Sequence, residues 1–563
     1  MTRRPAGAFP LFRHKPFALS IAAALLFPAP ALASGLIDNV NGITVDAQGD
    51  LVHFTGLVIG KDGRVEKRLA RGEPRPERPD YRYDGKGRTL IPGLIDAHGH
   101  VVELGFSRLN LDLSGSTSLE DAKARIAAFA AANPGRPWIL GFGWNQEAWG
   151  LGRFPTATDL AGLAGGRPIW LERVDGHAGW ANDAALAAAK ITATTKAPAG
   201  GRIPLEAGKP SGVLVDEAMG LMSKHVPLPQ PKDYDAALAK AQDALLSRGV
   251  TAIADMGTTI EGWQAYRRAG DRGALRIRIM GYARGIDQAA LIAGPGPTPW
   301  LYDDRLRLGG VKLYMDGALG SRGAWLKAPY SDAPKESGLP QVTPIQLRNQ
   351  MSRAAMDGFQ LAVHAIGDKA NAEVLDAIDE LSATYKGDRR WRIEHAQIVD
   401  PVDLPRFALH GTIASMQPQH ATSDWSMAIA RMGPDRLGGA YAWQAMLANK
   451  VPLAFGSDVP VEPGDPFIGL KAALTRTDGK GEPAGGWLPE QRVTLPEALR
   501  AYTWGAAYAG FAEQRFGNLA PGQQADFLIL DSDIELARPA DLPQTPIREV
   551  WIGGQRVTLR SAD

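Results

Sequence analysis

Two histidines in this sequence are placed where they could bind one cation. His98 and His100 are separated by a single residue and follow a short apolar run. Residues two apart in an extended strand point to the same side, so both imidazoles could reach one ion. A His-x-His pair also occurs by chance, so the pair alone is a weak sign of a metal site.

Four more titratable residues lie in or at the end of other short apolar runs: Lys312, His364, His395 and Asp458. Nitrogen and oxygen donors of this kind suit zinc, and the sequence contains no cysteine that could offer a thiolate instead. If these apolar runs are the strands of a parallel barrel, as argued below, their carboxyl ends lie at one face of the barrel. Side chains at those ends then converge. We therefore predict that these four residues and the histidine pair form one zinc-type centre.

Lys312 needs a separate explanation, because a divalent cation would repel its ammonium group. A neutral lysine amine can react with carbon dioxide to give a carbamate, an anion that could bridge two metals. The alternative is a buried lysine that pairs with Asp316 or Glu394. The residues alone do not favour the carbamate over this ion pair.

Eight short apolar runs predict the scaffold that positions these residues. They lie at 93–98, 250–255, 276–282, 311–315, 361–364, 391–394, 412–416 and 453–455. Helix-like stretches such as 346–357 and 370–385 lie between several of them. Strand–helix alternation implies parallel strands with right-handed crossovers, and eight such units close into a barrel. The predicted fold class is therefore α/β, a (β/α)8 TIM-type barrel.

Two further units are expected around this barrel, which should span residues 93–517. The interval between the first two runs is far too long for one crossover, and residues 110–246 contain strand-like pieces of their own. We predict a lobe inserted there, after the first barrel strand. Short β-like pieces at both chain ends, within 36–92 and 518–563, predict a small composite β-domain.

The first 33 residues have the order of an export signal. Four basic residues precede an apolar run at 17–27, and a small-residue cleavage site follows at 31–33. The run is too short for a stable membrane anchor, and the alternative is a buried first helix. We expect residues 1–33 to be a signal peptide, the mature protein to be periplasmic or secreted, and no membrane to be bound after cleavage.

Composition restricts the partners. Apolar residues make up 45% and charged residues 22%, as in soluble globular proteins. A formal net charge of +1 gives no basic excess to neutralise phosphates, so nucleic acid is not expected. The absence of cysteine excludes disulfides and thiolate nucleophiles. A small-molecule substrate is the partner that fits.

Seven motifs carry a resemblance to a known family. They lie at 92–100, 311–322, 363–368, 392–397, 416–420, 455–460 and 517–527, and include PGLIDAHGH, RIEHAQ and FGSDVP. In residue types and order they resemble the amidohydrolase superfamily, specifically amidohydrolase family 3, which includes N-substituted formamide deformylase-like proteins. The resemblance covers nearly the whole chain after residue 33.

This resemblance implies a binuclear zinc site. One metal would take His98, His100 and Asp458, the other His364 and His395, and a carboxylated Lys312 would bridge them; a single metal is the alternative. The implied activity is hydrolysis of a non-peptide carbon–nitrogen bond by a metal-bound hydroxide. Asp458 would be the general base, with a role as a pure ligand as the alternative. The composite β-domain would be a β-sandwich, and a homodimer is expected because relatives often form one.

Candidate substrate contacts are fewer and each has a structural alternative. His177 in the lobe and His420 after the seventh run could reach the substrate, or could be structural histidines. Arg322 could hold a carboxylate or carbonyl, or form an ion pair. Trp144 is one of several tryptophans in the predicted lobe. They could form an aromatic wall that favours an apolar or aromatic substrate, or they could pack in the core of the lobe.

Other functions remain open for the same centre. It could cleave esters, lactones or cyclic amides, or deaminate a ring. A catalytically inactive exported metal- or solute-binding protein would have lost a ligand, and no ligand position is lost here. A serine hydrolase is disfavoured, because Ser457 lies outside a Gly-x-Ser-x-Gly motif.

Overall fold

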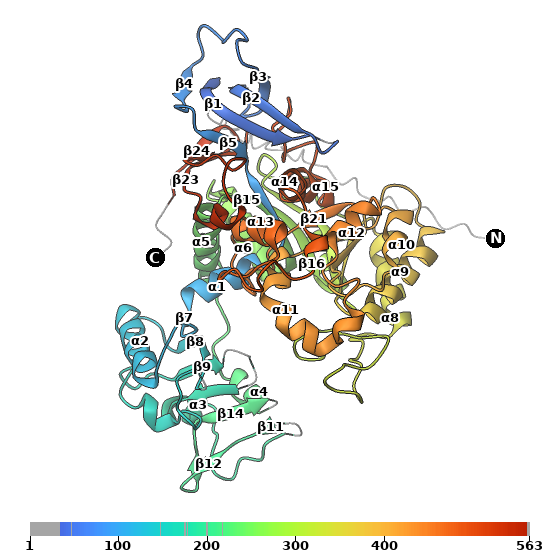
Figure 1. The fold of residues 1–563 in the computed structure, drawn as a ribbon. Coiled ribbons are helices and arrows are strands. Elements are labelled where there is room, and N and C mark those ends of the chain that lie inside the picture. Colours follow the sequence, from blue (N-terminus) through green and yellow to red (C-terminus); the bar gives the residue numbers. More distant parts are fainter. Residues whose placement is uncertain are drawn as a thin grey trace, which may run out of the picture.

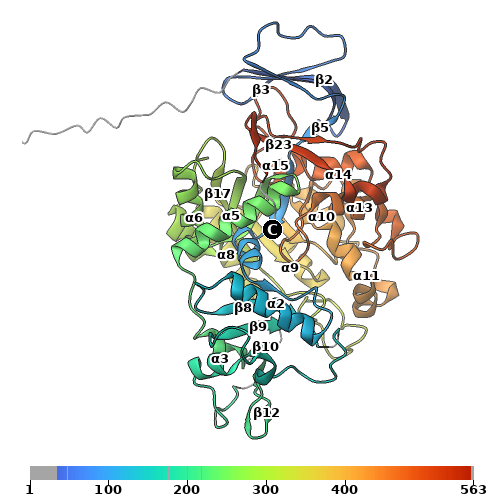
Figure 2. The ribbon, with the colours of Figure 1, turned by 90° about the vertical axis from the view of Figure 1, so that its left-hand side faces the viewer.

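The computed structural model describes residues 34–559, except 47, 147, 174, 175, 177, 199, 200 and 217. The expected signal peptide at 1–33 and the candidate His177 therefore lie outside the described residues. A central barrel carries a small β-domain at one end and a lobe at the other (Figures 1 and 2). None of the described helices is long and apolar enough to cross a membrane.

Eight parallel strands form the barrel sheet, in the order β6, β15, β16, β17, β18, β19, β20, β21. Their bounds are Leu94–Gly99, Val250–Thr258, Arg278–Arg284, Leu306–Tyr314, Gln360–Ala365, Arg392–His395, Ile413–Met416 and Leu453–Phe455. A parallel bridge between Gly99 and Val459 brings the first strand beside the last, so the barrel is nearly closed. Each strand overlaps one of the eight predicted runs, which confirms the predicted fold class.

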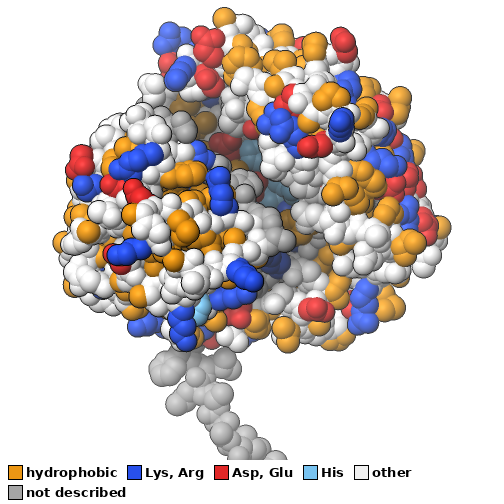
Figure 3. Space-filling view, turned by 90° about the horizontal axis from the view of Figure 1, so that it is seen from below, with side chains coloured by type: hydrophobic (Ala, Val, Ile, Leu, Met, Phe, Trp, Pro, Cys, Tyr) orange, Lys and Arg blue, Asp and Glu red, His pale blue; other side chains and the backbone are white. Residues whose placement is uncertain are grey.

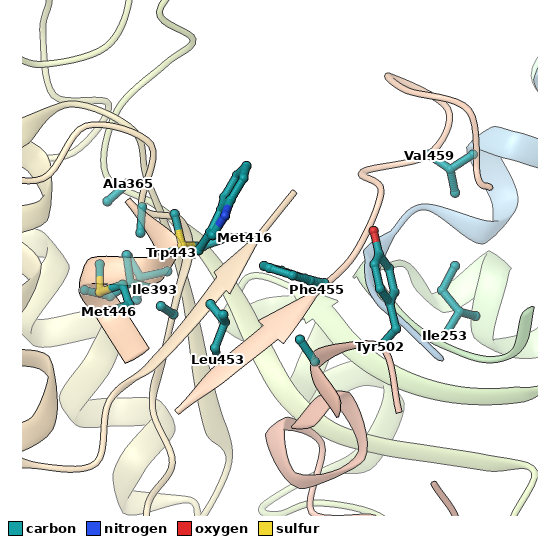
Figure 4. Close-up of a cluster of buried hydrophobic side chains, with 14 of the residues drawn as sticks. Ile253, Ala365, Ile393, Met416, Trp443, Met446, Leu453, Phe455, Val459 and Tyr502 are labelled. Carbon is teal, nitrogen blue, oxygen red and sulfur yellow. The ribbon is translucent and has the colours of Figure 1, made fainter. Parts of the chain in front are cut away.

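The barrel strands are almost entirely buried, which explains why they read as continuous apolar runs. Their outer faces pack against helices, and Figure 4 shows part of this core. The ring of Trp443 lies 5.9 Å from that of Phe455, which lies 5.5 Å from that of Tyr502. Such packing fixes the strands and therefore the side chains at their ends.

The helices around the barrel begin where the sequence offers caps. In α8, for example, Thr343 and Gln346 form a capping box and Pro344 takes the first position. The barrel helices are α1 (Val101–Leu109), α5 (Pro231–Ser247), α6 (Ile260–Asp271), α7 (Ile286–Ala293), α8 (Pro344–Met356), α9 (Asp368–Ser382), α10 (Leu404–Leu409), α11 (Pro418–Met432), α12 (Trp443–Ala448), α13 (Pro466–Thr475), α14 (Leu495–Ala501) and α15 (Trp504–Ala509).

The lobe follows α1 and contains a six-stranded sheet in the order β11, β14, β10, β9, β8, β7. Its strands are β7 (Leu111–Asp112), β8 (Ile139–Trp144), β9 (Ile169–Arg173), β10 (Ala178–Ala181), β11 (Gly201–Arg202) and β14 (Val213–Asp216). A hairpin of β12 (Leu205–Glu206) and β13 (Lys209–Pro210) and the helices α2 (Leu119–Ala132), α3 (Asp183–Ala188) and α4 (Met219–Ser223) complete it.

The end of the lobe needs a correction. We expected it to extend to residue 246, but α5 packs against α1, α6 and β15 of the barrel. Its buried face, including Leu238 and Leu245, belongs to the barrel core. The lobe therefore ends before α5. An apolar helix face does not say which neighbour it covers, so the sequence could not place this boundary.

Strands from both chain ends form the small β-domain, as predicted. They are β1 (Gly35–Val45), β2 (Leu51–Ile59), β3 (Val65–Leu69), β4 (Tyr81–Asp84), β5 (Thr89–Pro92), β22 (Phe527–Leu530), β23 (Ile547–Ile552) and β24 (Gln555–Val557). Hydrogen bonds join all eight into one sheet, in which β5 pairs with β22. Residues from both ends, such as Phe54 and Phe527, share one core. The two ends of the chain therefore pack together around one hydrophobic core.

A buried ion pair joins the barrel to this domain. Arg278 of β16 is 0% exposed and Asp526, next to β22, is 4% exposed. Arg278 Nε donates to Asp526 Oδ2 at 2.6 Å, and Nη2 donates to Oδ1 at 2.8 Å. The fork geometry makes this a strong contact, and neither charge has access to water.

Asp526→Ala should destabilise the protein by about 3–5 kcal/mol, because it leaves the Arg278 charge buried without its partner. The shift of the urea unfolding midpoint measures this loss. Asp62→Ala is the control, since Asp62 is 66% exposed and lies 4.0 Å from Arg64. An Asp526→Ala midpoint equal to that of the control would contradict the prediction.

Candidate metal centre

The six predicted ligands gather at the carboxyl ends of the barrel strands, on the side of the lobe. Figure 3 shows histidine side chains at the bottom of a hollow between the lobe and the barrel. The residues lie on β6 (His98), directly after β6 (His100), on β17 (Lys312), on β18 (His364), on β19 (His395) and after β21 (Asp458).

Short distances join these side chains. Nε2 of His100 lies 3.0 Å from Asp458 Oδ1, and Nε2 of His98 lies 3.5 Å from the same oxygen. The ring centroid of His395 is 4.7 Å from that of His98 and 4.5 Å from that of His364. One ligand atom each from His98, His395 and Asp458 lie within 4.8 Å of one another. This spacing allows one cation to be bound.

The charge states of His98, His364 and Asp458 suit a cation. Burial, followed by the charge of Lys312, lowers the pKa of His98 to about 4 and that of His364 to about 3. Burial opposes the charge of Asp458, but His98 and the hydrogen bond to His100 hold its pKa well below its usual range. Neutral imidazoles and an ionised carboxylate are the forms that bind metals.

A buried carboxylate orients His98. Nδ1 of His98 lies 2.6 Å from Glu394 Oε2, so Nδ1 carries the proton and Nε2 is left free to face the centre. Arg392 donates from Nε to Glu394 Oε1 at 2.7 Å, and from Nη2 to Oε2 at 3.1 Å. All three side chains are 0% exposed. The pair fixes which imidazole nitrogen can bind a cation.

The backbone near two other ligands is held in an uncommon conformation. His395 has a φ of 76° and Asp458 a φ of 63°, in the left-handed region that non-glycine residues seldom adopt. Nδ1 of His395 lies 2.9 Å from Gln417 Oε1, which directs its Nε2 toward the centre. Asp96 accepts from the backbone N–H of His98 at 3.0 Å and of Ser457 at 2.9 Å. Such local strain persists where surrounding contacts enforce it, commonly at functional sites.

Lys312 does not form the alternative ion pair. Its Nζ lies 3.3 Å from His98 Nε2, and no ion pair joins Lys312 to an acid within the described part of the chain. Asp316 instead accepts from three backbone N–H groups at the end of β18 and in the neighbouring loop. Burial lowers the pKa of Lys312 to about 8. The amine is therefore closer to its reactive neutral form than an ordinary lysine.

Among the candidate substrate contacts, His420 lies beside the centre. Its Nε2 is 3.7 Å from Asp458 Oδ2 and has no hydrogen-bond partner among the described residues. Gln397 Nε2 lies 3.2 Å from its Nδ1. If the amide group donates there, Nδ1 is the acceptor and Nε2 carries the proton. With this assignment, His420 has a buried N–H at Nε2, on the side of Asp458.

The other candidates are placed differently. Arg322 pairs with Asp332, Nη2 to Oδ2 at 3.0 Å, which is the structural alternative we left open. Trp144 is 0% exposed in the core of the lobe, and its Nε1 donates to the carbonyl of Leu171 at 2.8 Å. These contacts are those of structural side chains. His177 lies outside the described residues.

A polar network behind His420 escaped the sequence analysis. Asp424 lies 3.5 Å from Gln397 Nε2 and accepts from Tyr441 OH at 2.8 Å. Asp424 follows His420 by four residues in α11, so both lie on one helix face. That spacing was the signal that could have revealed it.

The donor set as a whole fits a divalent cation of borderline hardness. It offers four imidazoles and one carboxylate, most of them buried, and no sulfur ligand. Zinc prefers nitrogen and oxygen donors of this kind. His364 Nε2, which is buried without a hydrogen-bond partner among the described residues, is one nitrogen that a cation would satisfy.

Comparisons with known proteins agree with this geometry. The family model described as "Amidohydrolase family" matches residues 83–558. Protein LONG AFTER FAR-RED 3 of Arabidopsis thaliana is 36% identical over 468 residues, 80% of this chain and 79% of that protein. The N-substituted formamide deformylase of Arthrobacter pascens is 27% identical over 537 residues, 92% of this chain and 96% of that protein. The crystal structure of an uncharacterized metal-dependent hydrolase from Pyrococcus horikoshii OT3 matches with a TM-score of 0.76 and 29% identity, over 90% of this chain and 99% of that chain.

Proposed function

The chain belongs to the amidohydrolase family, a family of metal-dependent hydrolases, and from this premise we propose that it cleaves a non-peptide carbon–nitrogen bond in a small molecule. The observation that carries the proposal is the convergence of His98, His395 and Asp458 within 4.8 Å at the carboxyl end of the barrel. The similarity to a formamide deformylase supports an amide-type bond. We also propose that the protein works in the periplasm or outside the cell, as its signal-like residues 1–33 suggest.

In the proposed centre, His98, His100 and Asp458 would hold one zinc ion, and His364 and His395 would hold a second. Lys312, as a carbamate, would supply an anionic oxygen ligand to them. A bound zinc ion lowers the pKa of water from about 15.7 to about 7 and polarises a carbonyl oxygen. A single metal on the first three ligands is the simpler alternative.

Asp458 moves the proton in this proposal. Its carboxylate stays ionised near neutral pH, so it can accept a proton from the attacking water and pass it to the leaving nitrogen. The N–H on His420 Nε2, 3.7 Å from Asp458 Oδ2, is placed to donate to the carbonyl oxygen of the substrate as negative charge develops there. Such a bond would satisfy a donor that is otherwise buried and unpaired.

A substrate panel on zinc-loaded protein tests the function. We expect hydrolysis of N-formyl or N-acyl amines, followed as release of the amine. Activity confined to esters, lactones, cyclic amides or ring amines would favour the alternative chemistries. Tight metal binding without any turnover would favour an inactive exported metal- or solute-binding protein.

Lys312→Met should lower the bound zinc from two ions per chain toward one, because it removes the proposed bridge. Burial lowers the pKa of Lys312 to about 8, which raises the share of its amine that is uncharged and able to add to carbon dioxide. The amine nitrogen bonds to the carbon and releases one proton, giving the carbamate anion. Elemental analysis of dialysed protein measures the zinc.

The matched control is Lys471→Met. Lys471 is 7% exposed, and its Nζ donates to the carbonyl of Asp478 at 2.6 Å. The control variant should keep its zinc. If Lys312→Met protein kept two zinc ions, Lys312 would not be the bridge.

A further inference from the structure

An unpaired arginine lies at the mouth of the barrel, apart from the metal ligands. Arg284 ends β16, is exposed, and stands opposite Lys312 in the register of β16 with β17. The backbone N–H of Gly285 donates to the carbonyl of Lys312 at 3.1 Å, which holds the strand end in place. Within the described residues, the Arg284 guanidinium is in no hydrogen bond or ion pair. Its donors are therefore free for a ligand.

Arg284 and Lys312 line the same cavity. The cavity has a volume of about 460 Å³ at the rim of the barrel, and Tyr314, Gln341 and Gln350 also line it. None of the residues lining it is acidic. The Tyr314 ring lies 5.6 Å from the ring of His364, and Lys312 Nζ lies 5.1 Å from the same ring. A molecule at the centre could therefore extend past Tyr314 to Arg284.

Two acidic residues lie on the opposite side of the mouth. β20, which leads into α11, is four strands away from β16 around the eight-stranded sheet, so the two lie across the barrel. Asp424 of α11 and Glu462 after β21 pair with no lysine or arginine among the described residues. In the described part of the chain, these two acids bring no paired lysine or arginine to an anionic group, whereas Arg284 does offer a cation.

Glu103 on α1 is an acid close enough to interact with the charge of Arg284. The charge of Arg284 favours ionisation of Glu103 on α1, whose pKa is raised mainly by burial and by Asp255. No ion pair joins Glu103 to Arg284. Glu103 therefore does not occupy the guanidinium of Arg284 through an ion pair.

We propose that Arg284 binds a carboxylate of the substrate, so that the preferred substrates are N-formyl or N-acyl compounds that carry a carboxylate. A guanidinium offers parallel N–H donors that match both oxygens of a carboxylate. The scissile bond would lie over the metal ligands and the carboxylate in the cavity beside Tyr314. This inference rests on the proposed function and specifies its substrate class.

Matched substrate pairs test it. N-formylglycine and N-formylphenylalanine are compared with their carboxamides, which differ only in the anionic group. In zinc-loaded protein, Arg284→Met should raise KM for the carboxylates by about 10- to 100-fold, with little change in kcat and no change for the carboxamides. Arg284→Lys should give an intermediate rise, because it keeps the charge without the fork.

Arg71→Met provides the control for the loss of one positive charge. Arg71 is exposed in the turn after β3, in the small β-domain at the far end of the molecule. Calorimetric binding to zinc-loaded Asp458→Asn protein, with and without Arg284→Met, gives a second readout that needs no turnover. Carboxylates should bind more tightly than carboxamides only when Arg284 is present.

The outcomes separate the two proposals. Two results would overturn the role of Arg284 and leave amide hydrolysis standing. In the first, Arg284→Met weakens the binding of the carboxylate and the carboxamide equally, or weakens neither. In the second, neither compound binds at millimolar concentration. If zinc-loaded wild-type protein hydrolysed no member of the panel, the proposed function would fail. The binding comparison would then still decide whether Arg284 holds a carboxylate.

Discussion

Prolonged dialysis of the purified protein against a chelator is expected to lower hydrolysis by at least about 10³-fold, and added zinc to restore it. Cysteine is absent from the sequence, and His98 and His364 belong to the centre itself. In the proposed chemistry, activation of water and stabilisation of the oxyanion would both depend on the ion. Amine release before dialysis, after dialysis and after zinc addition measures the effect.

Two controls keep this result interpretable. Circular dichroism should show that the dialysed protein is still folded, because the barrel core and the Arg278–Asp526 pair do not involve the centre. Elemental analysis should show that the zinc has left. Full activity at a zinc content near zero would remove the proposed chemistry, whatever substrate is used.

The scaffold was predictable because barrel strands are buried on both faces. Runs such as 361–364 and 453–455 stand out in the sequence as uninterrupted apolar stretches. Strands β18 and β21 lie at these two runs, as predicted. Once the strands are parallel neighbours, the residue at each carboxyl end must face the same mouth. His364 and His395, on adjacent strands, therefore came together without any knowledge of side-chain packing.

Other features depend on packing that spacing does not encode. Glu394 and His98 are separated by 296 positions, and their contact needs the closure of the barrel and the rotamers of both side chains. We had considered Glu394 only as a partner of Lys312. For Trp144 the sequence suggested a functional role that the packing does not support. We considered it as part of a wall of the substrate site, but it is buried in the core of the lobe.

Arg284 illustrates why a free charge is invisible in a sequence. The sequence does not show which acids approach an arginine, whereas the structure shows no ion pair to Arg284 within the described residues. Neighbouring residues of a strand point to opposite faces of the sheet. A shift of one residue in the predicted strand would therefore place the Arg284 side chain on the other face. The register of β16 with β17 places Arg284 beside Lys312 and so at the mouth.

Asp458→Asn is expected to lower kcat by about 10²- to 10⁴-fold while much of the zinc is retained. Asparagine keeps the shape of the side chain and one oxygen that can coordinate a cation, but it cannot take up the proton of the attacking water. The imidazoles of His98 and His100, both within 3.5 Å of Asp458 Oδ1, continue to offer their nitrogens. Measurements of kcat and of zinc content on the same sample test this.

Asp304→Asn is the matched control, since Asp304 is also buried at 5% exposure but pairs with Arg64 and Arg515 next to the small β-domain. The decisive comparison is at saturating zinc. A pure ligand acts only through occupancy, so excess zinc would restore an Asp458→Asn enzyme if binding were its only defect. A general base acts on the proton, and no concentration of zinc replaces it. Recovery to the wild-type rate would therefore reduce Asp458 to a ligand, whereas a persistent loss at full occupancy would assign the proton transfer to its carboxylate.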